Sequence, residues 1–183
     1  MLVSDNYLKL YTNNKQALQT IYIIKKYTDK GSKDLKDCTI VDANAGVGGN
    51  SVFFCKYCKF VYCIDTELEA ITYLEHNLKE YENKTIIHEN CLDVLKIIKY
   101  DIIFFDPPWG GPKYKFQKNV QLYLSGINVN KIIESLYFSC NIIVLKAPVN
   151  FLINYNSLWI IHVNNIYKND HKTISFKLII FKK

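Results

Sequence analysis

Hydrophobic residues recur along the chain in two patterns that alternate with each other. Short runs rich in Ile, Val and Phe predict buried strands over residues 38–42, 59–65, 84–88, 100–106 and 141–148. Apolar residues at helical spacing predict helices over 13–26, 51–58, 66–82, 128–140 and 151–158, and Thr66 is expected to cap the third of these. The last segment, 159–183, predicts two strands around the polar turn 168–172.

Strands that alternate with helices indicate an α/β fold. We expect a mostly parallel seven-stranded sheet with helices on both faces and a C-terminal antiparallel hairpin. The length of 183 residues fits one domain, 1–183, in which residues 1–36 form a short N-terminal helical segment.

Composition and charge restrict the classes of protein to which the chain can belong. Hydrophobic residues make up 49% of the chain and aromatic residues 14%, which indicates a globular protein. The net charge of +6 comes from lysine alone, because the sequence contains no arginine, and it is compatible with a polyanionic partner. No apolar run reaches the roughly 20 residues of a membrane span, and the start lacks a secretory profile. We therefore expect an intracellular monomer without a membrane partner.

Six scattered cysteines fit reduced thiols better than a metal site. The pair Cys55 and Cys58 has zinc-like spacing, but no second pair follows it at a suitable distance. We therefore expect thiols and no bound metal.

Acidic residues stand at the ends of three predicted strands. Asp42 precedes the glycine-rich turn "ANAGVGGN", Asp65 follows about twenty residues later, and Asp93 follows the third strand. Ligands of parallel sheets bind at the carboxyl ends of strands, where Asp65 could bind ribose hydroxyls and Asp93 an adenine amine. Asp93 taken alone could equally be a helix cap. The turn lacks the G-x-G-x-x-G spacing, which disfavours a nicotinamide dinucleotide.

The segment "VDANAGVGGN" resembles the first motif of S-adenosylmethionine-dependent methyltransferases, and the later acidic strand ends and "DPP" follow in the order of that family. The resemblance implies a Rossmann-like class I methyltransferase fold and S-adenosylmethionine as the cofactor. It also implies a set of cofactor-binding residues: Asp42, Ala45, Gly46, Gly48, Asn50, Asp65, Thr66, Cys91, Asp93 and Asp106.

The stretch "DPPWGGP" begins at Asp106, directly after an apolar run. Two prolines stiffen the turn, so that Asp106 and the Pro107 carbonyl can accept hydrogens from a planar amine. Trp109 can stack on a base, and a cationic base would gain a cation–π attraction. None of the histidines His76, His88, His162 and His171 is expected to be catalytic.

The same stretch resembles the "SPPWGGP" signature of trimethylguanosine synthases, and the segments "LSGINVNKIIESLYFSCNIIVLKAPVN" and "DHKTISF" are similar to later parts of that family. The resemblance implies methyl transfer to the 2-amino group of a 7-methylguanosine RNA cap, which gives a di- or trimethylguanosine cap. It implies catalytic roles for Asp106, Pro107 and Trp109, and substrate contacts from Pro108, Trp109, Gly110, Tyr114, Lys146 and Asn150. The expected partner is capped small nuclear, nucleolar or messenger RNA, in the nucleus or alternatively the cytoplasm.

The sequence departs from that family at several points. Asp106 replaces the usual serine and moves the motif towards amine methyltransferases of adenine or guanine in ribosomal RNA or DNA. Arginines that would hold the triphosphate are absent, which leaves Lys113, Lys115, Lys118 and Lys146 as point charges. The segment before the first strand is short, so an N-terminal extension or a partner is expected to be missing. The alternatives are therefore a ribosomal RNA or DNA amine methyltransferase, and a cap-binding module that has lost catalysis.

Overall fold

The computed structural model describes residues 1–3, 12–28, 33–153, 158–168, 170 and 172–183. These residues form two compact units, Met1–Phe104 and Phe105–Lys183. The prediction of a single domain over 1–183 stays a prediction. Among the described residues, none of the helices combines the length and hydropathy that a membrane crossing requires.

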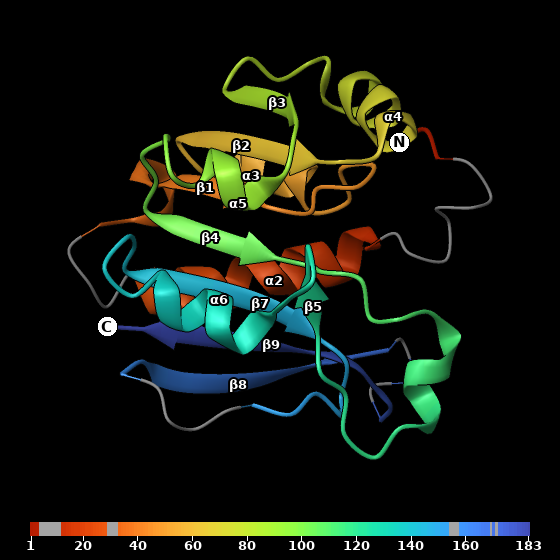
Figure 1. The fold of residues 1–183 in the computed structure, drawn as a ribbon. Helices are drawn as coiled ribbons and strands as arrows, with labels where there is room; N and C mark the ends of the chain where they lie inside the picture. The colour runs from red at the N-terminus through yellow and green to blue at the C-terminus, as the bar shows by residue number, and fades with distance from the viewer. Residues whose placement is uncertain (4–11, 29–32, 154–157, 169, 171) are drawn as a thin grey trace. The chain divides into compact units, whose positions relative to one another are not determined.

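Parallel strands form the centre of the first unit. They are β1 (Thr39–Asp42), β2 (Phe60–Asp65), β3 (Lys84–His88) and β4 (Ile102–Phe105), whose last residue begins the second unit. β1 pairs with β2 on one side and with β4 on the other, and β3 pairs with β2. In β1 and β4 almost every side chain is buried, as expected for strands covered on both faces. The carboxyl ends of β1 and β2 thus lie side by side, where Figure 1 shows their arrowheads.

Helices make up the rest of the regular structure of the first unit. They are α2 (Asn14–Thr28), the 3-10 helix η1 (Leu35–Asp37), α3 (Ser51–Tyr57), α4 (Leu68–Leu78) and the short α5 (Cys91–Val94). α3 contacts β2, and α4 contacts both β2 and β3. The side chain of Phe54 on α3 packs edge-to-face against Phe104 of β4, with ring centroids 5.1 Å apart. These apolar contacts fix the turn between β1 and α3.

Antiparallel strands form the centre of the second unit. β9 (Ile174–Lys182) pairs with β7 (Ile142–Ala147) on one side and with β8 (Ile160–Tyr167) on the other, and these blue strands lie side by side in Figure 1. The other elements are the 3-10 helix η2 (Pro112–Phe116), α6 (Val129–Ser135), and the small hairpin of β5 (Tyr123–Leu124) and β6 (Ile127–Asn128). The indole N–H of Trp159 donates to the Ile133 carbonyl at 3.2 Å, which ties the start of β8 to α6.

The complete sheet has seven strands in the order β3-β2-β1-β4-β7-β9-β8. The sequence-based fold prediction is therefore confirmed: the sheet is mostly parallel, ends in an antiparallel hairpin and is flanked by helices.

Two local predictions were wrong. In the segment predicted as a helix over 151–158, Phe151 instead forms a parallel bridge with Val120, while residues 154–157 lie outside the described residues. The α4 helix is capped by Glu67 rather than Thr66, because the Asp65 carboxylate accepts the backbone N–H of Glu67 and starts the turn there. The β5–β6 hairpin was not expected. Its tight turn is made by Ser125 and Gly126, both of which have positive φ.

Candidate functional site

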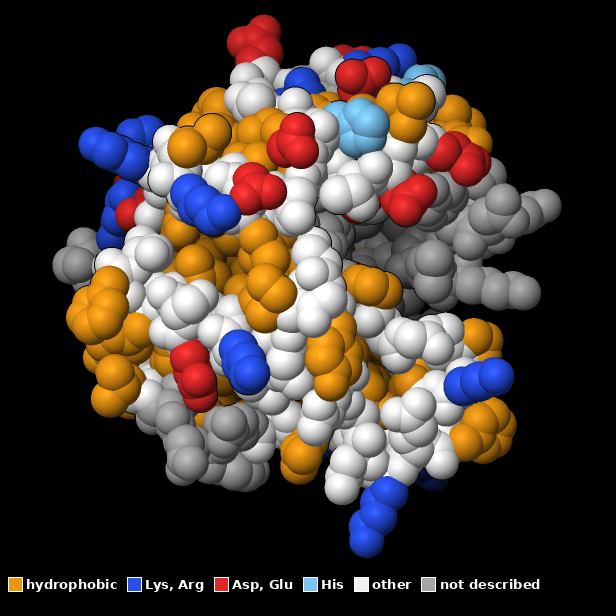
Figure 2. Space-filling model, in the orientation of Figure 1, with side chains coloured by type: hydrophobic (Ala, Val, Ile, Leu, Met, Phe, Trp, Pro, Cys, Tyr) orange, Lys and Arg blue, Asp and Glu red, His pale blue; other side chains and the backbone are white. Residues whose placement is uncertain are grey.

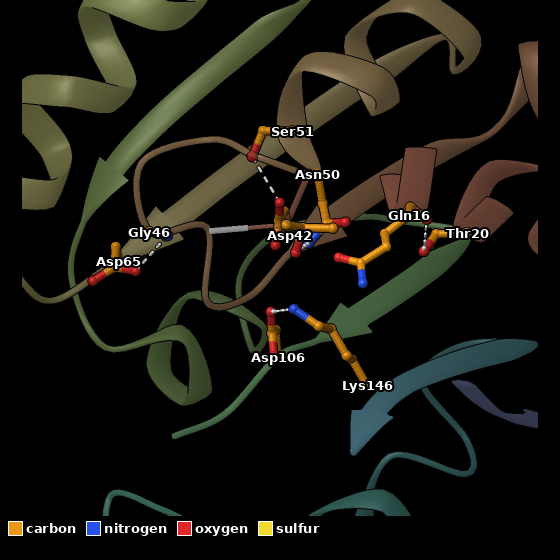
Figure 3. A network of polar contacts seen from close by, with 10 residues as sticks. Gln16, Thr20, Asp42, Gly46, Asn50, Ser51, Asp65, Asp106 and Lys146 are labelled. Carbon is orange, nitrogen blue, oxygen red and sulfur yellow. Dashed lines mark hydrogen bonds and ion pairs between the residues drawn. The ribbon is translucent and has the colours of Figure 1, made fainter. Parts of the chain in front are cut away.

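The carboxylate of Asp42 connects the end of β1 to the start of α3. Asp42 is only 1% exposed, and its Oδ2 accepts a hydrogen bond of 2.6 Å from the Ser51 hydroxyl, which is also buried. Figure 3 shows the two side chains pointing toward each other. The acid at the strand end therefore shapes the glycine-rich turn that lies between them. Sequence reasoning selected Asp42 but missed Ser51, because a serine after glycines is equally typical of an ordinary helix start.

The turn itself is held against the end of β2. The Ala45 N–H donates to the Ile64 carbonyl at 2.9 Å, and the Gly46 N–H donates to Asp65 Oδ2 at 2.7 Å. Gly46 has a φ of +52° and no atom within 4 Å of the place where a side chain would begin. A left-handed glycine with open space above it lets a ligand approach the backbone closely.

Asp65 has acceptor capacity left for a ligand. Its two oxygens receive the N–H groups of Gly46 and Glu67, at 2.7 and 3.0 Å. Each carboxylate oxygen can accept a second hydrogen bond, so a diol could still donate to Asp65. The backbone bonds meanwhile fix the orientation of the carboxylate at the strand end.

Two asparagines of the same turn present buried acceptors. Asn44 Oδ1 and Asn50 Oδ1 have no hydrogen-bond partner among the described residues, although Asn50 Nδ2 donates to the Thr12 hydroxyl at 3.2 Å. A buried acceptor without a donor costs about 1–3 kcal/mol. A donor such as an N–H group of a ligand would satisfy an acceptor of this kind. Asn50 was predicted as a site residue and Asn44 was missed.

The remaining predicted cofactor residues of the first unit, Thr66, Cys91 and Asp93, differ in their burial and in their partners. Cys91 is buried, and burial raises the pKa of its thiol to about 12. The Asp93 carboxylate is 62% exposed and pairs with Lys96 Nζ at 2.7 Å. Thr66 is exposed, and its carbonyl lies 2.9 Å from His88 Nε2. Asn90 caps α5 through a 3.0 Å bond from the Leu92 N–H.

The structure thus brings most of the predicted cofactor residues of the first unit to one turn. They are Asp42, Ala45, Gly46, Gly48, Asn50 and Asp65. Within the described part of the chain, no cluster of His, Cys, Asp or Glu side chains could hold a metal ion.

Asp106 forms a buried ion pair with Lys146 in the second unit. Asp106 Oδ2 lies 2.6 Å from Lys146 Nζ, and the two side chains are 19% and 7% exposed. They point toward each other in Figure 3. Burial raises the pKa of Asp106 above its ordinary value, and the ammonium of Lys146 partly offsets that rise. Lys146 was expected to contact a substrate, which stays a prediction; in the structure its ammonium pairs with Asp106.

Aromatic rings surround the ion pair. Trp109 and Tyr114 pack edge-to-face, with centroids 5.2 Å apart and an interplanar angle of 87°. Lys146 Nζ lies 5.8 Å from the centroid of Trp109 and 5.0 Å from that of Phe176 on β9. The indole Nε1 of Trp109 is buried and has no partner among the described residues. Burial raises the pKa of Tyr114, so its hydroxyl stays protonated at neutral pH.

Asn150 fixes the loop that follows Trp109. Its amide nitrogen donates to the carbonyls of Tyr114 and Gln117, at 2.8 and 2.7 Å. Both donors of the amide are therefore used on η2, and Asn150 orders the loop. In the loop itself, Pro107 is buried whereas Pro108, Gly110 and Gly111 are exposed.

Figure 2 shows lysine and acidic side chains interspersed on the drawn face, with hydrophobic side chains between them. Within the second unit, Lys113, Lys115 and Lys118 are exposed near η2 together with Phe116, which is 89% exposed. Positive charge and an exposed ring therefore occur together on the loop that follows Trp109.

A family model described as RNA cap guanine-N2 methyltransferase matches residues 38–177. The uncharacterized protein L320 of Acanthamoeba polyphaga mimivirus is 29% identical, over 85% of this chain and 70% of its own length. The trimethylguanosine synthase of Schizosaccharomyces pombe is 37% identical over 41% of this chain, which spans only 35% of that protein.

A solved structure supports the fold. The 16S rRNA N2 G1207 methyltransferase of Thermus thermophilus, in complex with AdoMet and guanosine, superposes with a TM-score of 0.66 at 11% identity. The alignment covers 94% of this chain and 44% of that one. The resemblance seen in the sequence motifs is confirmed by the family match, which spans more than half of the chain. The chain therefore belongs to the RNA cap guanine-N2 methyltransferase family.

Proposed function

We propose that the protein transfers methyl groups from S-adenosylmethionine to the 2-amino group of a 7-methylguanosine RNA cap. The observation that carries this proposal is the arrangement of the loop after β4. There the buried carboxylate of Asp106 and the ring of Trp109 both lie beside Lys146, and Tyr114 supports Trp109 from the side. A hydrogen-bond acceptor next to a stacking surface suits a flat base with an exocyclic amine.

The first unit has the groups that S-adenosylmethionine needs. Asp65 could accept the ribose hydroxyls, and the orphaned oxygens of Asn44 and Asn50 could accept from the ammonium of the methionine part. The open backbone at Gly46 leaves room for close approach. When bound, the cofactor supplies a methyl group activated on a sulfonium.

The second unit has the groups that the amine needs. Asp106 and the Pro107 carbonyl would accept the two amine hydrogens, which leaves the lone pair of the nitrogen directed away from both acceptors. The methyl group that S-adenosylmethionine would supply goes to that lone pair, and the cofactor would be left as a neutral thioether. The proton that the nitrogen then loses can pass to Asp106 or to water. Rate enhancement would come mainly from positioning.

The RNA would be held by charge near η2. Lys113, Lys115 and Lys118 are exposed, and the sequence has no acidic residue between Asp106 and Glu134. Lysines neutralise phosphates as point charges, which suits a triphosphate bridge or a backbone without base specificity. Capped small nuclear, nucleolar or messenger RNA in the nucleus is the partner that we propose.

A second candidate is a guanine amine methyltransferase of ribosomal RNA. It is favoured by Asp106, because a carboxylate stands where the cap enzymes usually have serine. In that case the 7-methyl group of the base would be dispensable.

Mass spectrometry separates the two candidates. Purified protein would be incubated with S-adenosylmethionine and a 7-methylguanosine dinucleotide cap, an unmethylated cap, or guanosine-containing RNA without a cap. We expect one or two added methyl groups on the 7-methylguanosine cap alone. Equal methylation of the unmethylated cap or of internal guanosine would replace the cap proposal with the second candidate.

A further inference from the structure

We propose that Lys146 is a positioning residue of the reaction, which keeps Asp106 ionised and holds its carboxylate beside the Trp109 ring. This inference rests on the proposed function, because it takes Asp106 as the acceptor of the amine hydrogens. Lys146 is a lysine in an otherwise apolar strand. The six residues of β7 are all buried, and Lys146 is the one among them that carries a charge.

A carboxylate at the place of Asp106 needs a partner. Burial disfavours the charged form, and a protonated Asp106 would offer one acceptor fewer to an amine. Lys146 Nζ lies 2.6 Å from Oδ2, which is the distance of a strong charge-assisted hydrogen bond. Lys146 therefore opposes the effect of burial and fixes one edge of the carboxylate.

The surroundings of Lys146 hold its ammonium in place. The neighbouring Leu145 and Ala147 are fully buried in β7, and β7 is paired with β9 at Lys146 and Leu178. The ammonium also faces the Phe176 ring of β9 at 5.0 Å. Because the strand and the ring both restrict the Lys146 side chain, its ammonium can fix the position of Asp106 at the start of the loop after β4.

The same ammonium also faces the stacking ring. It lies 5.8 Å from the Trp109 centroid, so one cation contacts both the proposed acceptor and the proposed stacking surface. Moving Lys146 would then disturb the distance between the plane of the base and the acceptor of its amine. An ion pair that served stability alone would also lower the carboxyl pKa of Asp106, so the pH profile of kcat and the contrast between kcat and KM are the readouts that identify a positioning role.

The test compares Lys146→Met, Lys146→Arg and the double variant Asp106→Asn with Lys146→Met. Among the described residues, Lys146 on β7 is the charged group beside Asp106, while Trp109 and Phe176 contribute neutral rings beside Lys146. In Lys146→Met we expect the carboxyl pKa of Asp106, followed by NMR of ¹³C-labelled aspartate in the free protein, to rise by about one unit or more. We expect kcat to fall about tenfold or more at neutral pH with little change in the KM for S-adenosylmethionine. Activity should recover as the pH rises, because the acidic limb follows the higher pKa.

The other variants guard against misfolding. Lys146→Arg keeps the charge and should retain the pH profile. The double variant buries no unpaired charge; it should fold and stay slow at every pH, because it has no carboxylate left to ionise. An unchanged Asp106 pKa in Lys146→Met, or a loss of activity that is equal at every pH, would overturn the inference. If the wild-type protein methylates no guanine while the pKa still rises, the proposed function fails and the ionisation role of Lys146 stands without its catalytic consequence.

Discussion

At the scale of single residues, the proposed chemistry divides between a few side chains with distinct tasks. Trp109 presents a ring, Asp106 presents an acceptor, and Asp65 presents a carboxylate to a diol. Each of them is supported by a neighbouring group: Tyr114 for Trp109, Lys146 for Asp106 and the Gly46 N–H for Asp65. Substitution of Trp109, Asp106 or Asp65 should therefore act directly on ligand binding or catalysis. Substitution of a supporting group should act through the residue that it holds.

Replacing Trp109 by alanine should abolish most methyl transfer to the cap. Stacking contributes roughly 1–3 kcal/mol per base, and a cationic base adds roughly 0.5–2 kcal/mol, so cap affinity should fall about tenfold or more. Cap binding by fluorescence and turnover by mass spectrometry would measure the effect. Trp109→Phe keeps a ring and should lose much less, while binding of S-adenosylmethionine should stay the same in both variants. Full turnover by Trp109→Ala would refute the stacking role.

Replacing Asp65 by alanine should weaken binding of S-adenosylmethionine. Hydrogen bonds to a charged acceptor contribute about 1.5–3 kcal/mol, so titration calorimetry should show a loss of about tenfold or more. Asp93→Ala is the matched control, because that carboxylate is exposed and pairs with Lys96. We expect a smaller loss there. A Kd for Asp65→Ala equal to that of the wild type would remove Asp65 from the cofactor site.

At the scale of elements, the strands were predictable and the connections were not. The apolar runs that became β1, β4 and β7 are nearly continuous in β-branched and aromatic residues, so burial on both faces could be predicted from them. The helix predicted over 151–158 failed because local spacing cannot see the backbone of Val120, which draws Phe151 into a bridge.

The site residues likewise divide into those that the sequence predicted and those that it did not. Most residues around the β1–α3 turn are close in sequence, or are strand ends at known spacing, and were predicted as site residues, whereas Asn44 and Ser51 were missed. The Asp106–Lys146 pair joins residues 40 positions apart. A lone lysine inside "IIVLKAP" was the available signal, and it was first interpreted as a contact to phosphate.

The loop around η2 should carry the salt-dependent part of RNA binding. Replacing Lys113, Lys115 and Lys118 together by glutamine should weaken binding of capped RNA at low salt. The slope of log affinity against log salt should fall by about 0.7 for each lost phosphate contact. Fluorescence anisotropy at several salt concentrations would measure it. Lys79→Gln with Lys99→Gln, at exposed positions of the first unit, is the control and should leave the slope unchanged. An unaltered slope in the triple variant would place the RNA elsewhere.

At the scale of the whole molecule, the cysteines belong to the core of both units. All six are free and buried. Burial raises the pKa of the Cys38 thiol to about 11 and those of Cys91 and Cys140 to about 12, and it contributes to raised pKa values of Cys58 and Cys63. The thiolate forms that react with alkylating agents are thus disfavoured at neutral pH.

Alkylation should therefore report global folding. We expect iodoacetamide to modify the native protein slowly at neutral pH and all six cysteines rapidly after unfolding in guanidinium, as counted by mass spectrometry. Raising the pH should accelerate native labelling only where the thiol also gains access to solvent. Rapid labelling of Cys55 and Cys58 in the native state would contradict their burial.

The segment that begins at Lys146 holds the loop after β4 at both of its ends. Lys146 fixes Asp106 at the start, and at the far end Asn150 and Leu152 exchange backbone hydrogen bonds with Val120 at 2.8 and 2.9 Å. Both ends of the loop are therefore anchored in the folded protein before RNA binds. The entropy of ordering these residues is lost during folding, so it does not reduce the affinity for RNA. Lengthening the loop by inserted glycines should consequently affect recognition more than it affects the melting temperature.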